Sequence, residues 1–272
     1  MLPAAEVGAG AASALDVTLL AVLQGLTEFL PVSSSGHLVL AEHLLGLREG
    51  GLALAVALHL GTLLSVLLVY AGAVRDTLAD LLRGRPAEAL RLVLASLPAA
   101  LVGILFEDWI EERFGDARGA AFGLLLTAAV LALAEVLRRR RARLGATPRP
   151  LRAGTALATG VAQAISILPG VSRSGSTIST AMALGVAPAE AARFSFLMSL
   201  IAVGGAALLQ ARKLGGEDAG SPGVLLLAWG VALSALVGWA ALKLLLAFLG
   251  RGAFGWFALY CAALGLGWLA LA

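Results

Sequence analysis

The sequence predicts an all-α, polytopic membrane protein with six transmembrane helices and two re-entrant helix hairpins in an inverted-topology repeat. Of its 272 residues, 60% are hydrophobic and only 14% are charged, whereas a soluble domain carries about 25% charged residues. Several apolar runs are long enough to cross a bilayer, and two more are interrupted by Pro, Gly and Ser. The net charge of +3 gives no sign of a nucleic-acid partner.

The predicted spans have the length of about 20 mostly apolar residues that a transmembrane helix requires. They lie at residues 51–72, 87–106, 120–137, 190–210, 224–249 and 253–272. We expect residues 1–272 to form a single domain in the lipid bilayer, with repeat halves at about 12–137 and 151–272.

Two other apolar stretches, 15–47 and 153–187, are interrupted near the middle. The first interruption reads Leu-Pro-Val-Ser-Ser-Ser-Gly-His over 30–37, and the second reads Pro-Gly-Val-Ser-Arg-Ser-Gly-Ser-Thr over 169–177. Pro removes a helix donor, Gly frees φ, and Ser favours the N-cap of a helix. Each stretch is therefore predicted to fold as helix, break and helix, either as a re-entrant hairpin or as a broken helix.

The distribution of positive charge predicts which connections face the cytoplasm. The connection at 138–152 carries seven Arg and no acidic residue, whereas 107–119 carries five acidic residues against two Arg. We expect the first to be a cytoplasmic loop and the second to lie outside, together with 211–223. Counting spans outward from these loops places both chain ends outside if the two interrupted stretches are re-entrant and do not cross the membrane.

A shift of 139 residues aligns the two interrupted stretches without gaps. It gives eight identities in a window of 25 residues, among them Gln24 on Gln163, Ser33 on Ser172 and Gly36 on Gly175. The same shift carries the first three spans onto the last three. Because three is an odd number, the halves have opposite orientations, and the two breaks are expected to meet near the bilayer midplane.

The breaks also contain the chemistry-bearing residues. Ionisable groups at membrane depth are costly and are candidates for function, and here they are Glu28, His37 and Arg173. Ser-rich turns at helix starts offer backbone N–H groups, hydroxyls and the positive end of the helix dipole. Since the planar fork of Arg suits phosphate oxygens, the combination predicts a phosphate-binding site that also holds the elements of hydrolysis.

Both breaks resemble signatures of a known family. Residues 24–37 resemble the (Glu/Gln)-x-x-x-Glu region of the undecaprenyl-diphosphate phosphatases, the BacA/UppP family, and residues 169–177 resemble their Pro-Gly-x-Ser-Arg-Ser-x-x-Thr signature. The resemblance implies an enzyme of the bacterial inner membrane that hydrolyses undecaprenyl diphosphate to undecaprenyl phosphate and inorganic phosphate. Such an enzyme recycles the lipid carrier for peptidoglycan and cell-wall synthesis and confers bacitracin resistance. A periplasmic active site and a divalent cation, Mg²⁺ or Ca²⁺, are also implied.

These signatures suggest a role for each residue. Glu28 and Gln24 are expected to bind the cation, although a Gln in the first position leaves the motif with one carboxylate. Ser34 matches the family's proposed nucleophile, and His37 is expected to take its proton, unless a water activated by Glu28 or His37 attacks directly. Arg173 is expected to hold the diphosphate. Hydroxyls that would bind phosphate oxygens or cap the helices belong to Ser33, Ser35, Ser172, Ser174 and Thr177.

An alternative function is a secondary transporter or lipid flippase, because inverted repeats with broken helices are typical of transporters. The Ser triplet beside a carboxylate and opposite Ser-Arg-Ser argues for hydrolysis, since transport needs neither a nucleophile nor a base. The sequence leaves open which Ser attacks and whether the protein forms a homodimer.

Overall fold

The computed structural model describes residues 12–45, 51–113, 116–213, 222–250 and 254–271, and every regular element in these ranges is a helix. Five helices have the length and hydropathy of a membrane span: α3 (Gly51–Val69), α5 (Ala87–Leu105), α7 (Ala117–Arg143), α10 (Pro188–Lys213) and α11 (Val224–Gly250). The sixth predicted span corresponds to α12 (Gly255–Leu271), an apolar helix of 17 residues. An all-α polytopic membrane protein is confirmed.

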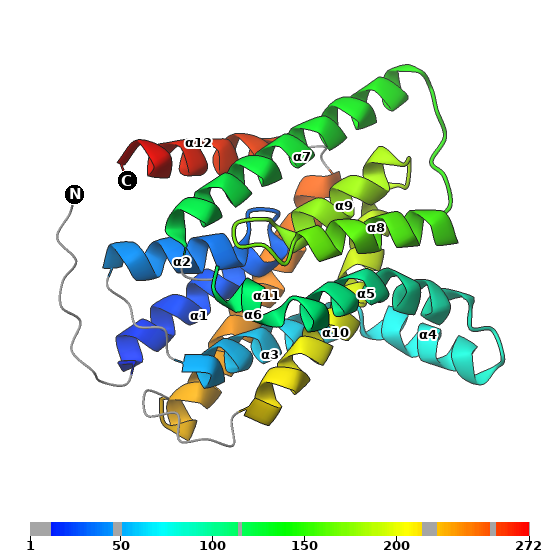
Figure 1. Ribbon diagram of the computed structural model, residues 1–272. Helices are drawn as coiled ribbons and strands as arrows, with labels where there is room; N and C mark the ends of the chain where they lie inside the picture. Colours follow the sequence, from blue (N-terminus) through cyan, green and yellow to red (C-terminus); the bar gives the residue numbers. More distant parts are fainter. Residues whose placement is uncertain (1–11, 46–50, 114–115, 214–221, 251–253, 272) are drawn as a thin grey trace.

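The two interrupted stretches form helix hairpins, α1 (Ala14–Phe29) with α2 (Ser34–Leu45) and α8 (Ala153–Ile165) with α9 (Arg173–Ala183). The longest arm, α1, has 16 residues and rises about 24 Å, short of the ~30 Å hydrocarbon core. In Figure 1 the first hairpin extends from the centre to the left and the second from the centre to the right. The hairpins therefore approach the centre from opposite sides.

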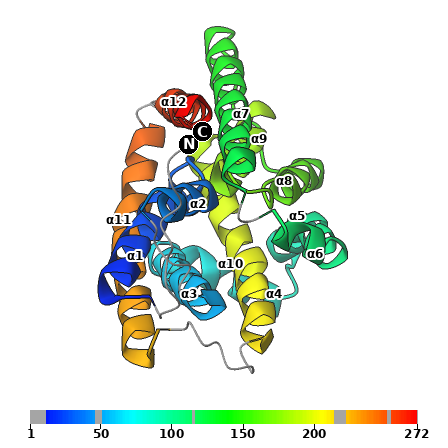
Figure 2. The same cartoon turned by 60° about the vertical axis from the view of Figure 1, so that its left-hand side comes forward.

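Two pairs of helices related by the repeat lie side by side. α7 packs against α12, and α3 packs against α10, as both Figure 1 and Figure 2 show. α7 and α12 run in opposite directions, which is the arrangement that an inverted repeat produces. The start of α1 and the end of α12 lie at the left of Figure 1, whereas α4 (Ala71–Leu82) and the start of α8 lie at the right.

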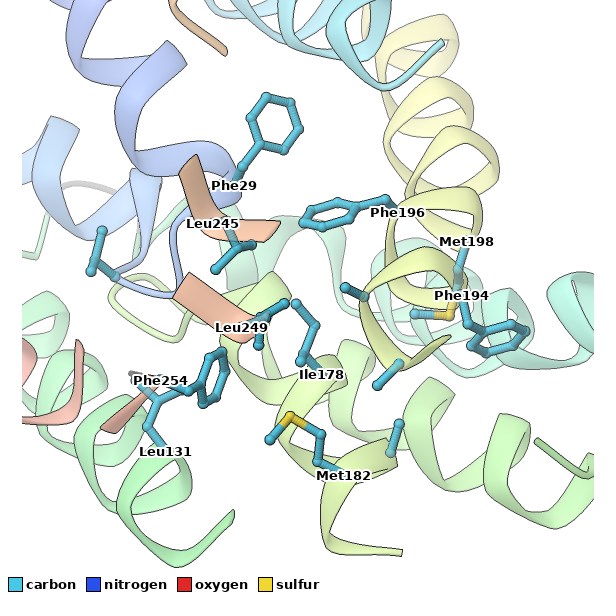
Figure 3. Close-up of a cluster of buried hydrophobic side chains, with 14 of the residues drawn as sticks. Phe29, Leu131, Ile178, Met182, Phe194, Phe196, Met198, Leu245, Leu249 and Phe254 are labelled. Carbon is cyan, nitrogen blue, oxygen red and sulfur yellow. The ribbon is translucent and has the colours of Figure 1, made fainter. Parts of the chain in front are cut away.

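The apolar core joins the hairpins to the spans of both halves. Figure 3 shows Phe29 of α1 near Phe196 of α10, with Ile178 of α9 and Leu245 of α11 close by. The rings of Phe29 and Phe196 meet edge to face, with centroids 5.6 Å apart. Because lipid tails are as apolar as these side chains, close packing holds the helices together, and transfer out of water contributes little.

Three helical segments differ from the sequence-based expectation. α7 continues through Arg143, so the first part of the predicted 138–152 loop is helical; Arg138 and Arg139 extend it by donating to Glu135, one turn back, at 2.8 and 2.6 Å. α4 and the short α6 (Glu107–Glu111) occupy stretches that were expected to be loops. Residues 214–221 of the predicted outer segment lie outside the described residues.

Candidate active site at the joint between the hairpins

The two breaks touch, as the repeat predicts. A Cβ added to Gly36 at the start of α2 would lie 3.0 Å from the Cα of Gly170 in the second break. The repeat-related Gly175 at the start of α9 lies against Pro31 of the first break, where an added Cβ would be 3.3 Å from the Pro31 Cβ. These reciprocal contacts confirm that the breaks meet. Glycine is needed here because the chains approach so closely.

The starts of α2 and α9 are built in the same way. The hydroxyl of Ser33 accepts the N–H of Gly36 at 3.2 Å, and the hydroxyl of Ser172 accepts the N–H of Gly175 at 3.0 Å. A distance of 3.3 Å separates the hydroxyl oxygens in both of the repeat-related pairs, Ser33–Ser35 and Ser172–Ser174. Ser33 and Ser172 therefore act as N-caps, one of the two roles expected for them.

Glu28 lies at the centre of a hydrogen-bond network that joins the hairpins. Its Oε2 accepts from the hydroxyl of Ser34 at 2.7 Å and from Nε2 of Gln24 at 3.1 Å. Its Oε1 accepts from Nη2 of Arg173 in the other hairpin at 2.6 Å. The side chains of Glu28 and Arg173 are only 8% and 14% exposed, so the ion pair is largely shielded from solvent. Three predicted site residues thus converge on the carboxylate of a fourth.

Several buried polar atoms of the hairpins have no protein partner within the described part of the chain. They are Nη1 of Arg173, Oε1 of Gln24, both amide atoms of Gln163 and Oγ of Ser179. An unpaired buried polar group costs about 1–3 kcal/mol, so such atoms mark places where a ligand or water completes the bonding. Gln163 was not predicted as a functional residue. Its alignment with Gln24 in the repeat was the signal that could have identified it.

The position of His37 differs from the expected one. Its Nδ1 lies 2.7 Å from the carbonyl oxygen of Ser33, and its Nε2 lies 2.7 Å from the hydroxyl of Tyr260. The hydroxyl of Ser34 donates to Glu28, not to His37. The structure therefore pairs Ser34 with Glu28 and not, as expected, with His37. Tyr260 belongs to no recognised motif, and no sequence pattern pointed to it.

Two expected phosphate ligands instead brace α9. Thr177 is fully buried, and its hydroxyl bonds with the carbonyl of Arg173 at 2.7 Å and with the hydroxyl of Ser195 at 2.6 Å. The hydroxyl of Ser174 donates to the carbonyl of Leu30 in the first hairpin at 3.3 Å. These contacts tie the turn that carries the guanidinium to α10 and to the opposite break.

The donor set is compatible with a divalent cation. In the described residues no group of three His, Cys, Asp or Glu side chains could enclose a metal. The carboxylate of Glu28 and the unpartnered Oε1 of Gln24 are nevertheless the hard oxygen ligands that Mg²⁺ and Ca²⁺ prefer. Since Mg²⁺ is commonly held by one or two carboxylates and by substrate phosphates, these residues fit a cation that binds together with a diphosphate.

Comparisons with known proteins identify the family of this chain. The family model described as "Bacitracin resistance protein BacA" matches residues 17–267. Similar proteins from Thermomicrobium roseum (41% identical) and Halothermothrix orenii (40%) are both named undecaprenyl-diphosphatase. Each alignment covers 92% of this chain and 95% of the relative. The chain therefore belongs to the BacA bacitracin resistance family.

Proposed function

We propose that this chain is an undecaprenyl-diphosphate phosphatase of the bacterial inner membrane, which releases inorganic phosphate and returns undecaprenyl phosphate to cell-wall synthesis. The observation that carries the proposal is the buried carboxylate of Glu28, bonded to the hydroxyl of Ser34 and to the guanidinium of Arg173. These groups are a base, a nucleophile and a charge clamp for phosphoryl transfer. The name shared by the relatives, undecaprenyl-diphosphatase, supports the same reaction.

In the first step Arg173 remains hydrogen-bonded to Glu28 through Nη2, and its unpartnered Nη1 donates to the diphosphate. The N-terminal ends of α2 and α9 add positive potential beside the phosphates. The oxygen of Ser34 attacks the terminal phosphorus, and its proton passes to Glu28. The bond from that phosphorus to the bridging oxygen breaks, and undecaprenyl phosphate leaves with the proton that Glu28 returns.

In the second step water attacks the phosphoserine at Ser34. Glu28 accepts a proton from the water, phosphate leaves, and Glu28 reprotonates the oxygen of Ser34. The competing route omits the covalent intermediate, and a water deprotonated by Glu28 attacks the lipid diphosphate directly. In both routes Glu28 is the base and Arg173 is the clamp.

A divalent cation held by Glu28 and Gln24 would neutralise part of the phosphate charge. We expect a chelator to abolish phosphate release, and Mg²⁺ or Ca²⁺ to restore it. The Gln24→Met variant, which removes one oxygen ligand, should require about tenfold more cation for half-maximal rate. The exposed Gln210 of α10 provides a matched control, Gln210→Met, whose cation dependence should equal that of the wild type. An unchanged cation dependence of Gln24→Met would remove Gln24 from the metal site.

The active site is proposed to open to the periplasm. Support comes from the resemblance to the BacA/UppP family, which implies a periplasmic site. The Arg-rich end of α7 and the 138–152 connection favour the cytoplasm for one end of the spans, but they do not decide the opening of a site where the two hairpins meet. A short-chain, water-soluble diphosphate that cannot cross the membrane should be hydrolysed by right-side-out vesicles and not by inside-out vesicles. Equal rates in the two preparations before detergent is added would contradict the periplasmic assignment.

The experiment that tests the function itself is phosphate release from undecaprenyl diphosphate by purified protein in detergent. Transport needs two compartments, and detergent removes them, so turnover under these conditions requires hydrolysis. Absence of phosphate release with either Mg²⁺ or Ca²⁺ would favour the transporter or flippase.

A further inference from the structure

Both ring nitrogens of His37 are engaged. The side chain is 8% exposed, with Nδ1 paired to the carbonyl oxygen of Ser33 and Nε2 to the hydroxyl of Tyr260, each at 2.7 Å. The two rings also stack, with centroids 5.6 Å apart and planes within 5°. The phenol and the imidazole therefore form one rigid unit at the start of α2.

The partners of His37 define its tautomer. A carbonyl oxygen can only accept, so Nδ1 must carry the hydrogen that points to Ser33. In the neutral ring Nε2 is then the acceptor, and the hydroxyl of Tyr260 donates to it. Nδ1 is held by the carbonyl oxygen of Ser33, just before α2, and Nε2 is held by the hydroxyl of Tyr260, so the phenol helps to fix the orientation of the imidazole ring.

Tyr260 belongs to a support that the second break does not have. The repeat makes α12 the counterpart of α7, on which Thr127 clamps the second break by accepting from the N–H of Ser172 at 2.9 Å and donating to the carbonyl of Gly170 at 3.0 Å. The 139-residue shift places Leu266 where Thr127 stands, and Tyr260 where α7 has Ala121. The halves thus hold their breaks differently, and the phenol serves only the break that carries Ser34.

We propose that Tyr260 is a positioning residue of the phosphatase, which holds Nε2 of His37 through its hydroxyl and so fixes the orientation of the imidazole ring beside the Ser34 turn at the start of α2. This inference rests on the proposed function only in so far as His37 contributes to the reaction. The phenol acts through the imidazole, and its removal leaves the Glu28–Ser34–Arg173 network intact.

The kinetic test is Tyr260→Phe, which keeps the stacked ring and removes the hydroxyl. Loss of one hydrogen bond of ordinary strength corresponds to about a tenfold effect, and we expect kcat to fall by that factor while KM stays the same. The chain has one other tyrosine, Tyr70, whose ring stacks on Phe196 of α10 and not on His37. The matched control Tyr70→Phe should leave both constants unchanged. A wild-type kcat in Tyr260→Phe would overturn the proposal.

A double-mutant cycle separates positioning from general packing. In a His37→Gln background, Tyr260→Phe should cause no further fall in kcat, because the phenol no longer has an imidazole to direct. An equal fall in both backgrounds would mean that Tyr260 supports the fold independently of His37, and the proposal would be wrong.

A spectroscopic readout is independent of turnover. In protein labelled with ¹⁵N-histidine, Nε2 of wild-type His37 should resonate as a hydrogen-bonded acceptor, because the hydroxyl of Tyr260 donates to it. Tyr260→Phe should shift this resonance toward that of an unbonded ring nitrogen and leave the resonances of His59 unchanged. The same Nε2 resonance in both proteins would refute the positioning role even in a fully active enzyme. Conversely, the expected shift in a protein that releases no phosphate would support Tyr260 as the residue that positions His37 and reject the proposed hydrolysis.

Discussion

Replacing Arg173 by Ala is expected to lower kcat/KM for undecaprenyl diphosphate by about 10³-fold or more. The guanidinium is the group of the second hairpin that reaches Glu28, and its Nη1 is buried without a protein partner. Removing a single preorganised donor to developing charge typically costs 10²- to 10³-fold. Here the same change also leaves the carboxylate of Glu28 unpaired. Lys offers a point charge and no planar fork, so Arg173→Lys should recover only part of the loss.

This experiment must separate a loss of folding stability from a loss of catalysis. Removing one partner of a buried ion pair lowers the free energy of unfolding by about 3–5 kcal/mol. The double variant Glu28→Gln/Arg173→Met removes both charges, and it should regain thermal stability while remaining inactive. Arg193 is the matched control, since it is also partly buried and pairs with Glu88 at 2.6 Å and Glu190 at 2.8 Å. Folded Arg193→Ala should keep its specific activity. If folded Arg173→Ala stayed within tenfold of the wild type, the site would lie elsewhere.

Much of the fold could be predicted because its determinants are local. Apolar runs of about 20 residues identify spans, and Pro, Gly and Ser at two points identify breaks. The prediction of helix ends was wrong where a helix continues into a charged segment. Arg138 and Arg139 mark the end of the hydrophobic run, yet α7 goes on because they bond to Glu135 one turn earlier. The amphipathic α4 was missed because its charged residues interrupt the hydrophobic pattern.

The site was predictable as a set of residues but not as a set of pairs. The repeat alone implied that Glu28 and Arg173 would come together. The choice between Glu28 and His37 as partner of Ser34 depends on the turn before α2, where Ser33 adopts φ 70°. A non-glycine residue in this left-handed region costs about 1–2 kcal/mol, and no sequence motif predicts this backbone conformation at Ser33. Tyr260 is 223 residues from His37 and has no counterpart in the repeat. Only the packing of α12 brings it there.

The last expected result concerns the nucleophile. Ser34→Ala should lower kcat by about 10³-fold or more, because it removes the attacking oxygen and the covalent intermediate with it. With substrate labelled in the terminal phosphate, acid quenching of the wild type should yield a phosphorylated peptide that contains position 34, and the variant should yield none. Ser199, buried on α10 with its hydroxyl bonded to the carbonyl of Phe196, supplies the control Ser199→Ala, which should turn over normally.

The hydrogen bond between Ser34 and Glu28 lets the Ser34→Ala variant distinguish the phosphoserine route from direct attack by water. The hydroxyl lies 2.7 Å from a carboxylate oxygen, the length of a strong charge-assisted bond, so the proton acceptor is in place before substrate arrives. Direct attack by water needs Glu28 and has no need of Ser34, whereas the covalent route needs both. Glu28→Gln should therefore be inactive in either case, since a positioned base contributes about 10²- to 10⁴-fold. Full turnover by Ser34→Ala, together with an inactive Glu28→Gln, would establish the water route and reject the phosphoserine.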